Sequence, residues 1–250
     1  MLRRPTLLVA AASLAFLLGL VWQAPADLLG RASAALGWQL IDPSGRLWAG
    51  RAAALRGGPL ALQDLRWELQ PLALLRGRLA LALEAGLPGG FLRGRVAIGR
   101  DRLAFRDLEA AVPLALAGPW VGMPVAEGDA SLRFDYLLLI DGWPRAAVGE
   151  LRLAGVPLGL PGSAGDAGHG DFRLSFSQAE PAERLSAELR DFGGDLELSG
   201  QLQLEAPNRY LLSGRVRARA QAPDSLRQGL ALVGPADRDG RHEFSFSGSL

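Results

Sequence analysis

The nine residues LRFDYLLLI, at positions 132–140, show the pattern that governs most of the chain. An apolar or aromatic side chain occupies every even position, and Arg133 and Asp135 lie between them. Successive side chains of a β-strand point to opposite faces of its sheet. This stretch therefore predicts a strand with one apolar face and one partly charged face.

The same alternation recurs along the rest of the chain, at 60–69, 79–83, 92–98, 103–105, 151–153, 172–176, 185–189, 196–204, 210–216 and 244–250. Short turn signals separate these runs: Gly57-Gly58-Pro59, Pro88-Gly89-Gly90, Asp141-Gly142, Gly193-Gly194-Asp195, Ala206-Pro207-Asn208 and Asp239-Gly240. Short strands at this spacing are typical of antiparallel sheet. We predict a mainly β fold, with one curved, mostly antiparallel sheet or an incomplete barrel and short peripheral helices.

Local departures from the alternation predict local features. Leu60 and Leu62 alternate, but Leu65 and Trp67 resume one position later, which predicts a bulge near Gln63-Asp64. Glycines within strands mark bulges, bends or close backbone approach and favour strong curvature; they are Gly50, Gly77, Gly94, Gly149, Gly200, Gly214 and Gly248. Helices are predicted at Asp27–Leu36, ended by Gly37, at Pro71–Leu75, and at Asp224–Leu232 between Pro223 and Gly234.

The segment GVPLGLPGSAGDAGHG, residues 155–170, is rich in glycine and almost uncharged. It has two interpretations: a boundary between domains, or the long flexible loop of a hairpin. Similar strands on both sides favour the loop.

The N-terminus indicates export from the cytoplasm. Arg3 and Arg4 precede an apolar run from Leu7 to Trp22, which counted from Pro5 is at the short end of the lengths that cross a ~30 Å hydrocarbon core as a helix. The arginines predict a cytoplasmic N-terminus. A cleaved signal peptide is the alternative, because Ala24-Pro25-Ala26 fits a cleavage site. We predict an anchor at 1–26 and a β-rich domain at 27–250 outside the cytoplasm.

Composition excludes several kinds of chemistry. The 250 residues carry a net charge of +1, every basic residue is arginine, and cysteine is absent. No bulk field attracts nucleic acid, and disulfides, thiolate metal sites and cysteine nucleophiles are excluded.

Few residues suggest a catalytic or metal site. His169 and His242 have no ligand partner at metal-binding spacing, and Asp237 and Asp239 flank a turn that lacks the distal glutamate of a calcium loop. Arg215, Arg217 and Arg219 share one strand face, which is either solvated or meets an acidic partner. We expect no catalytic, cofactor-binding or metal-ligating residue and no cofactor. A glycan hydrolase with two distant carboxylates stays open as an alternative.

Three stretches together resemble the type II secretion system protein N family. They are GRLWAGRA at 45–52, LRWELQP at 65–71 followed by LLRGRL at 74–79, and a C-terminal part with Leu232, Gly234, Asp237, Gly240-Arg241 and FSFSGSL at 244–250. Their order and spacing carry the resemblance, and residues 100–220 add no motif to it.

The resemblance implies a non-enzymatic accessory component of the bacterial inner membrane, crossing it once and keeping the anchor uncleaved. The domain would then lie in the periplasm, support export of folded proteins across the outer membrane, and contact other inner-membrane components of the apparatus. An alternative is an AsmA-like lipid-handling protein. Leu79, Leu81 and Leu83 have Ala80 and Ala82 between them, so both strand faces are apolar, as at 137–140. Two apolar faces indicate burial on both sides or a lipid-lined groove.

Overall fold

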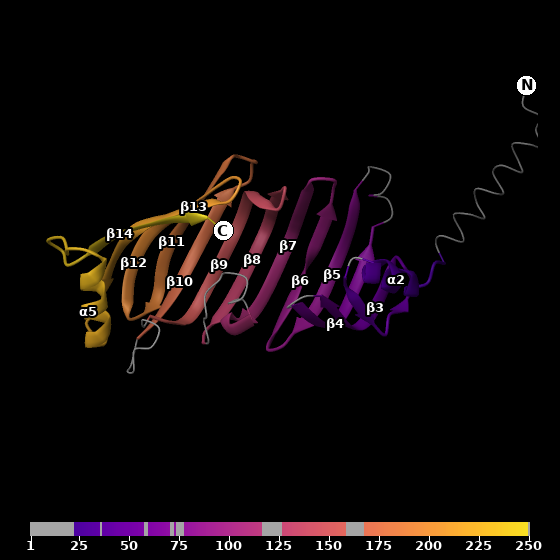
Figure 1. Cartoon of the computed structure of the whole chain (residues 1–250), viewed down its shortest axis with the longest axis horizontal. Helices are drawn as coiled ribbons and strands as arrows, with labels where there is room; N and C mark the ends of the chain where they lie inside the picture. Colours follow the sequence, from indigo (N-terminus) through magenta and orange to yellow (C-terminus); the bar gives the residue numbers. More distant parts are fainter. Residues whose placement is uncertain are drawn as a thin grey trace, which may run out of the picture. The chain divides into compact units, whose positions relative to one another are not determined.

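The computed structural model describes residues 23–35, 37–57, 60–70, 73, 78–116, 127–158 and 168–249. Contacts divide the chain into two compact units, one ending at Pro88 and one starting at Gly89. In Figure 1 the first unit is indigo to purple, and the second runs from purple through orange to yellow. Both consist mainly of antiparallel strands, so the predicted mainly β fold is confirmed.

The first unit begins with helix α2 and continues as a small sheet. Its elements are α2 (Asp27–Ala35), β1 (Gln39–Ile41), β2 (Ser44–Gly45), β3 (Ala49–Gly57), β4 (Leu60–Leu69) and β5 (Leu79–Leu87). The strand order is β1-β3-β4-β5, and β2 also pairs with β3. Ala52, Leu62, Leu65, Trp67 and Ala85 form its buried core together with Ala26.

The described residues of the second unit form nine strands that pair in chain order. They are β6 (Gly90–Ile98), β7 (Arg102–Pro113), β8 (Asp129–Ile140), β9 (Trp143–Pro157), β10 (His169–Gln178), β11 (Arg184–Gly194), β12 (Leu196–Glu205), β13 (Arg209–Ala218) and β14 (His242–Ser249). Helix α5 (Asp224–Val233) lies at the β14 end, where β14 curls forward over the preceding strands (Figure 1). In the described part of this unit β6 does not pair with β14, so the sheet is not closed.

The predicted helices at both ends of the described chain are confirmed. Helix α2 is followed by Gly37, which has a positive φ of 80°. Pro223 directly precedes α5, which buries Leu226 and Leu230 against the sheet while Leu232 stays 80% exposed. The predicted turn at Pro71–Leu75 lies outside the described residues except for Ala73.

The hairpin interpretation of residues 155–170 agrees with the strand pairing. Strands β9 and β10 pair with each other, and Val156 lies opposite Gly170. The segment therefore joins two neighbouring strands of one sheet; its residues 159–167 lie outside the described part of the chain.

The expected anchor lies outside the described residues as far as Trp22. Among the helices that the structure describes, none has both the length and the apolar character needed to cross a membrane.

Candidate functional site

The second unit has an apolar face that runs across its described strands from β6 to β14. Cross-strand partners share a face of the sheet, so the pairing register lines up residues from β6 to β14. A central row consists of Leu92, Ala110, Leu132, Leu151, Leu174, Leu189, Gly200, Gly214 and Phe244. A second row beside it consists of Leu108, Phe134, Gly149, Phe176, Ala187, Leu202, Leu212 and Phe246. We call these two rows the apolar face.

Aromatic rings pack within the second row. The rings of Phe134 and Phe176 lie 5.5 Å apart, centroid to centroid, with Gly149 between their strands. A Cβ added to Gly149 would clash with the backbone carbonyl oxygen of Arg133 and would meet the Phe134 ring at 2.8 Å, so only glycine fits there. Gly149 therefore allows close approach of the β8 backbone, one of the roles that the sequence predicts for glycines within strands.

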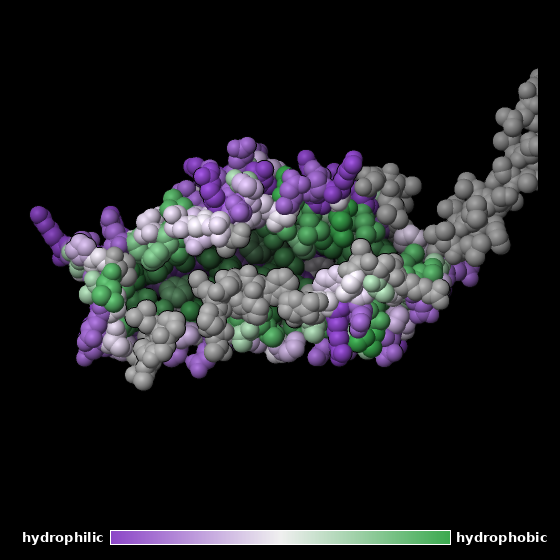
Figure 2. All heavy atoms as spheres, in the orientation of Figure 1, coloured by the Kyte–Doolittle hydropathy of each residue, from purple (hydrophilic) through white to green (hydrophobic). Residues whose placement is uncertain are grey.

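Helix α5 covers the apolar face only at its β14 end. There Leu196, Val216 and Phe244 are buried beneath the helix. Phe246, two residues after Phe244 on the same face, is 54% exposed. Figure 2 shows green, apolar side chains lining a hollow behind the pale rim that β14 forms. Leu151, Leu174 and Leu202 are half-buried in the middle of the face.

The apolar face continues past a slip in register as a third row. The register of β7 and β8 slips at Asp107 and Asp135, so Phe105 and Leu137 follow Leu108 and Phe134 on this face. Farther along the sheet this row consists of Ala147, Leu185, Leu204 and Tyr210. Arg106 and Tyr136 lie on the opposite face beside Arg95, with the Arg106 guanidinium 5.8 Å from the centre of the tyrosine ring.

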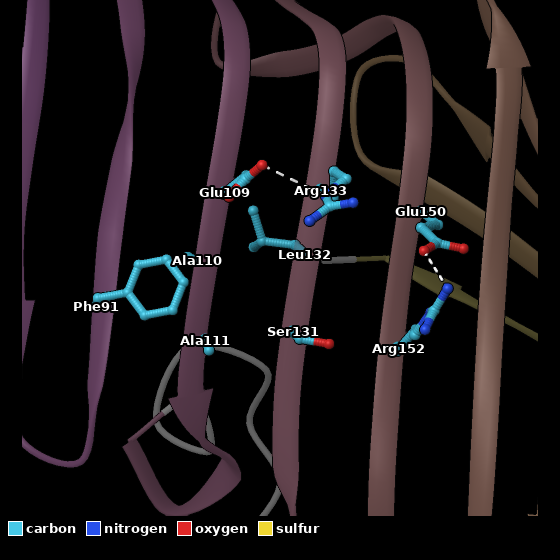
Figure 3. A pocket seen from close by; sticks show the side chains of 9 residues that line it. All are labelled: Phe91, Glu109, Ala110, Ala111, Ser131, Leu132, Arg133, Glu150 and Arg152. Atoms are coloured by element: carbon cyan, nitrogen blue, oxygen red, sulfur yellow. Dashed lines mark ion pairs between the residues drawn. The ribbon is translucent and has the colours of Figure 1, made fainter.

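The opposite face of the same sheet is charged. Its central row consists of Arg93, Glu109, Arg133, Glu150, Ser175, Glu188, Gln201, Ser213 and Ser245. Figure 3 shows part of this face, with Glu109 beside Arg133 and Glu150 beside Arg152. The difference between the central rows of the two faces follows from the alternation of side chains along each strand.

The carboxylate of Glu109, on the charged face, forms ion pairs with two arginines of neighbouring strands. Arg93 Nε donates to Glu109 Oε2 at 2.9 Å, and Arg133 Nε lies 3.4 Å from Glu109 Oε1. The hydrogen bond from Arg93 lowers the pKa of Glu109 below its ordinary range. A glycosidase acid needs a raised pKa to hold its proton, so this environment is the opposite of what that alternative requires.

The three arginines at 215–219 each have a carboxylate of this chain as partner. Arg215 pairs with Glu243, Arg217 with Glu197 and Arg219 with Asp191. These internal ion pairs favour the interpretation of a solvated strand face over a patch for an acidic partner.

The turn at Asp237 is stabilised by its own backbone. Asp237 Oδ1 accepts hydrogen bonds from the amides of Asp239 at 2.8 Å and Arg241 at 2.9 Å. The hydrogen bond from the amide of Arg241 lowers the pKa of the Asp237 carboxyl.

The two histidines lie in different parts of the second unit. His242 Nδ1 lies 2.7 Å from the carbonyl oxygen of Gly234, and His169 begins β10. Across the described ranges, no three His, Asp or Glu side chains are grouped as metal ligands.

The apolar face was not singled out from the sequence. The alternating strands were visible, but which side chains become neighbours depends on the register between strands.

Known proteins are similar to this chain along most of its length. The family model for type II secretion system protein N matches residues 36–245. The type II secretion system protein N of Aeromonas hydrophila is 31% identical, covering 85% of this chain and 84% of its own. Those of Vibrio cholerae and Pectobacterium carotovorum are 28% and 25% identical, covering 86% and 95% of this chain and 86% and 94% of their own. No solved structure matches. The chain therefore belongs to the type II secretion system protein N family.

Proposed function

We propose that this protein is a non-enzymatic accessory component of the type II secretion machinery, anchored in the inner membrane with its β-rich domain in the periplasm. There it supports export of folded periplasmic proteins across the outer membrane. The observation that carries the proposal is the family match over residues 36–245, directly behind the apolar run at 7–22.

The charge pattern of the N-terminus supports the topology. Arg3 and Arg4 precede the apolar run, and cytoplasmic flanks of membrane spans are enriched in arginine and lysine. The domain that follows has no cysteine and so needs no redox partner for folding in an oxidising compartment. We propose other inner-membrane components of the apparatus as its partners.

The decisive experiment is deletion of the gene in its host, followed by mass spectrometry of the medium and the periplasm. We expect secreted enzymes to accumulate in the periplasm, folded and active, while outer-membrane permeability is unchanged. Expression of the full chain should restore export. Normal export in the deletion strain would overturn the proposed role.

The topology has a separate test. Alkaline phosphatase fused after Leu250 should be active, because it matures only outside the cytoplasm, and a green fluorescent protein fused there should be dark. The Arg3→Glu, Arg4→Glu variant is expected to reduce phosphatase activity by weakening the orientation signal. The mass of the purified full chain distinguishes an uncleaved anchor from cleavage after Ala26. Cleavage would overturn the single-pass anchor while leaving the periplasmic domain in place.

A further inference from the structure

We propose that strand β14 of the second unit pairs, antiparallel, with β14 of a second copy of this chain. This goes beyond the proposed secretion role, which makes no statement about self-association. In the described part of the chain, β14 pairs with β13 along one side, and its other side forms a single bridge, between Ala236 and His242 at its start. Beyond that bridge, the backbone N–H and C=O groups of this side are open to a further strand.

The first argument is that the edge of β14 lacks the usual protection. Proteins protect edge strands by making them short or by adding prolines, bulges or charged side chains. The edge strand β1 of the first unit is short, with three residues. Strand β14 has eight residues and no proline, and all eight pair with β13 without a register shift. An edge this long and regular is a template for another strand.

The second argument is that the side chains of β14 complement a second β14. Phe244 and Phe246 point to the apolar face, and Ser245 and Ser247 point to the charged face. Residues that lie opposite each other in an antiparallel pair share a face. When the apolar faces of two copies lie on the same side, phenylalanine and glycine positions of one strand meet those of the other, and serines meet serines. Aromatic pairs and hydroxyl pairs across strands both stabilise a sheet.

The third argument concerns the register of the pair. Phe246 is 54% exposed, whereas Phe244 is 9% exposed and lies beneath α5. Pairing centred on Phe246 places the two exposed rings opposite each other. It also places Phe244 opposite Gly248 of the second copy, so no side chain of that copy enters the space beneath the helix. We therefore assign the register in which Phe246 faces its own counterpart.

The fourth argument is the position of the charges in this register. Glu243 is the one carboxylate of β14, and it forms an ion pair with Arg215 of β13. Centring the pair on Phe246 places Glu243 opposite Ser249 of the second copy. The glutamates of the two copies then lie at opposite ends of the paired strands, so like charges do not meet.

The test uses disulfide crosslinking of the full chain in its host. The chain has no cysteine, so one introduced cysteine is the only thiol of each copy. Pairing through a single strand is narrower than a standard interface of ~1,600 Å², so it is tested in the cell rather than in dilute solution. Opposite residues of an antiparallel pair have Cα atoms ~4.5–5.5 Å apart, which suits a disulfide. After mild oxidation, Phe246→Cys should give a dimer on a non-reducing gel, identified by mass spectrometry.

Two matched controls separate pairing from random encounter. Ser213 lies on β13 opposite Ser245, one strand inward. In the proposed dimer the two copies of Ser213 are three strand spacings apart, at least ~14 Å, which is too far for a disulfide. Ser131 is exposed on β8 and reports collisions. We expect Phe246→Cys to yield at least tenfold more dimer than Ser213→Cys or Ser131→Cys.

The register has its own test, in which two differently tagged copies carry Ser245→Cys and Ser247→Cys. These positions lie opposite each other in the proposed pair, so the mixed dimer should exceed the dimer of either variant alone, whose thiols lie diagonally, ~7–8 Å apart. Adding Phe246→Glu to both copies places like charges opposite each other and should lower the mixed dimer several-fold. Leu232→Glu, at an 80% exposed position of α5, should leave it unchanged.

Three results would overturn the proposal: a Phe246→Cys dimer no more abundant than that of Ser213→Cys, crosslinks of β14 only to another protein, or a mixed dimer that Phe246→Glu does not reduce. Crosslinking is measured independently of export. A secretion defect on deletion without β14 crosslinks refutes self-pairing alone. Crosslinks together with normal export in the deletion strain refute the secretion role alone.

Discussion

Gly50 and Trp67 lie opposite each other in the register of β3 and β4, and the indole of Trp67 covers the bare backbone of Gly50. A Cβ at position 50 would overlap the ring. The indole nitrogen donates to the carbonyl of Leu47 at 3.1 Å, which ties the ring to the turn before β3. The stretches at 45–52 and 65–71 that carry the family resemblance are thus two halves of one packing unit.

Replacing Gly50 by alanine should therefore destabilise the first unit. The methyl group would displace the Trp67 ring from its buried position and strain its hydrogen bond to Leu47, at a cost of about 1–3 kcal/mol. Chemical unfolding monitored by tryptophan fluorescence measures this. Gly229→Ala in α5 is the control, because nothing lies within 4 Å of its added Cβ. Helix propensity predicts that it stabilises by about 0.5–1 kcal/mol. An equal loss in both variants would contradict the close-approach explanation.

Two phenylalanines on one strand should differ sharply in their contribution to stability. Phe244 is 9% exposed beneath α5, and Phe246 is 54% exposed on the same face. Phe244→Ala leaves a cavity and should lower the free energy of unfolding by about 3–5 kcal/mol. Phe246→Ala should change it by less than about 1 kcal/mol, since little burial is lost. Thermal unfolding of the two variants side by side checks the difference, and similar losses would show that the β14 end of the face is covered in solution.

Much of the fold could be predicted from local sequence signals. The slip near Gln63-Asp64 corresponds to a register shift against β5, with Asp64 at a φ of 47°. The same signal occurs in β7, where the alternation of Leu103 and Phe105 resumes one position later at Leu108, but it was not interpreted there. The structure places a register shift at that point, with Asp107 at a φ of 49°.

The candidate site was less predictable, because it arises from pairing between distant strands. The sequence shows apolar residues on both faces of β8 and leaves burial and a groove as alternatives. The structure shows burial on both faces of this strand. Leu132 and Leu137 pack against the cluster of Phe134 and Ala147 on the apolar face, whereas Leu138 lies opposite the fully buried Ala146 on the other face. Which face a residue joins depends on the bulges between β8 and β9, and those follow from the register rather than from either strand alone.

Asp191 should be the most important carboxylate for the stability of the second unit. Its side chain is 11% exposed, accepts a hydrogen bond from the Leu198 amide at 2.8 Å and pairs with Arg219. Asp191→Ala would leave both donors without this partner, at a cost of about 2 kcal/mol. Glu243→Ala removes the partner of Arg215, but Glu243 is 72% exposed, and a loss below about 0.5 kcal/mol is expected. Urea unfolding of both variants tests the order, and a larger effect for Glu243 would refute it.

Acid should weaken the second unit partly through Glu109. The hydrogen bond from Arg93, followed by the charges of Arg93 and Arg133, lowers the pKa of Glu109 from its ordinary value of 4.5. A carboxyl whose pKa is lower in the folded state stabilises the fold above its unfolded pKa, and this contribution is lost as the pH falls through the folded pKa. Titration of the Glu109 side-chain carbonyl by NMR should give a midpoint below 4.5.

Arg93→Gln should raise the midpoint of Glu109 toward 4.5 and make unfolding less sensitive to acid below that pH. The reason is that the folded and unfolded states then bind protons more equally. Arg238→Gln removes the same charge from an exposed turn and should leave the Glu109 midpoint where it is. If both variants shift the midpoint alike, the net charge of the protein sets the pKa of Glu109, and the ion pair with Arg93 does not.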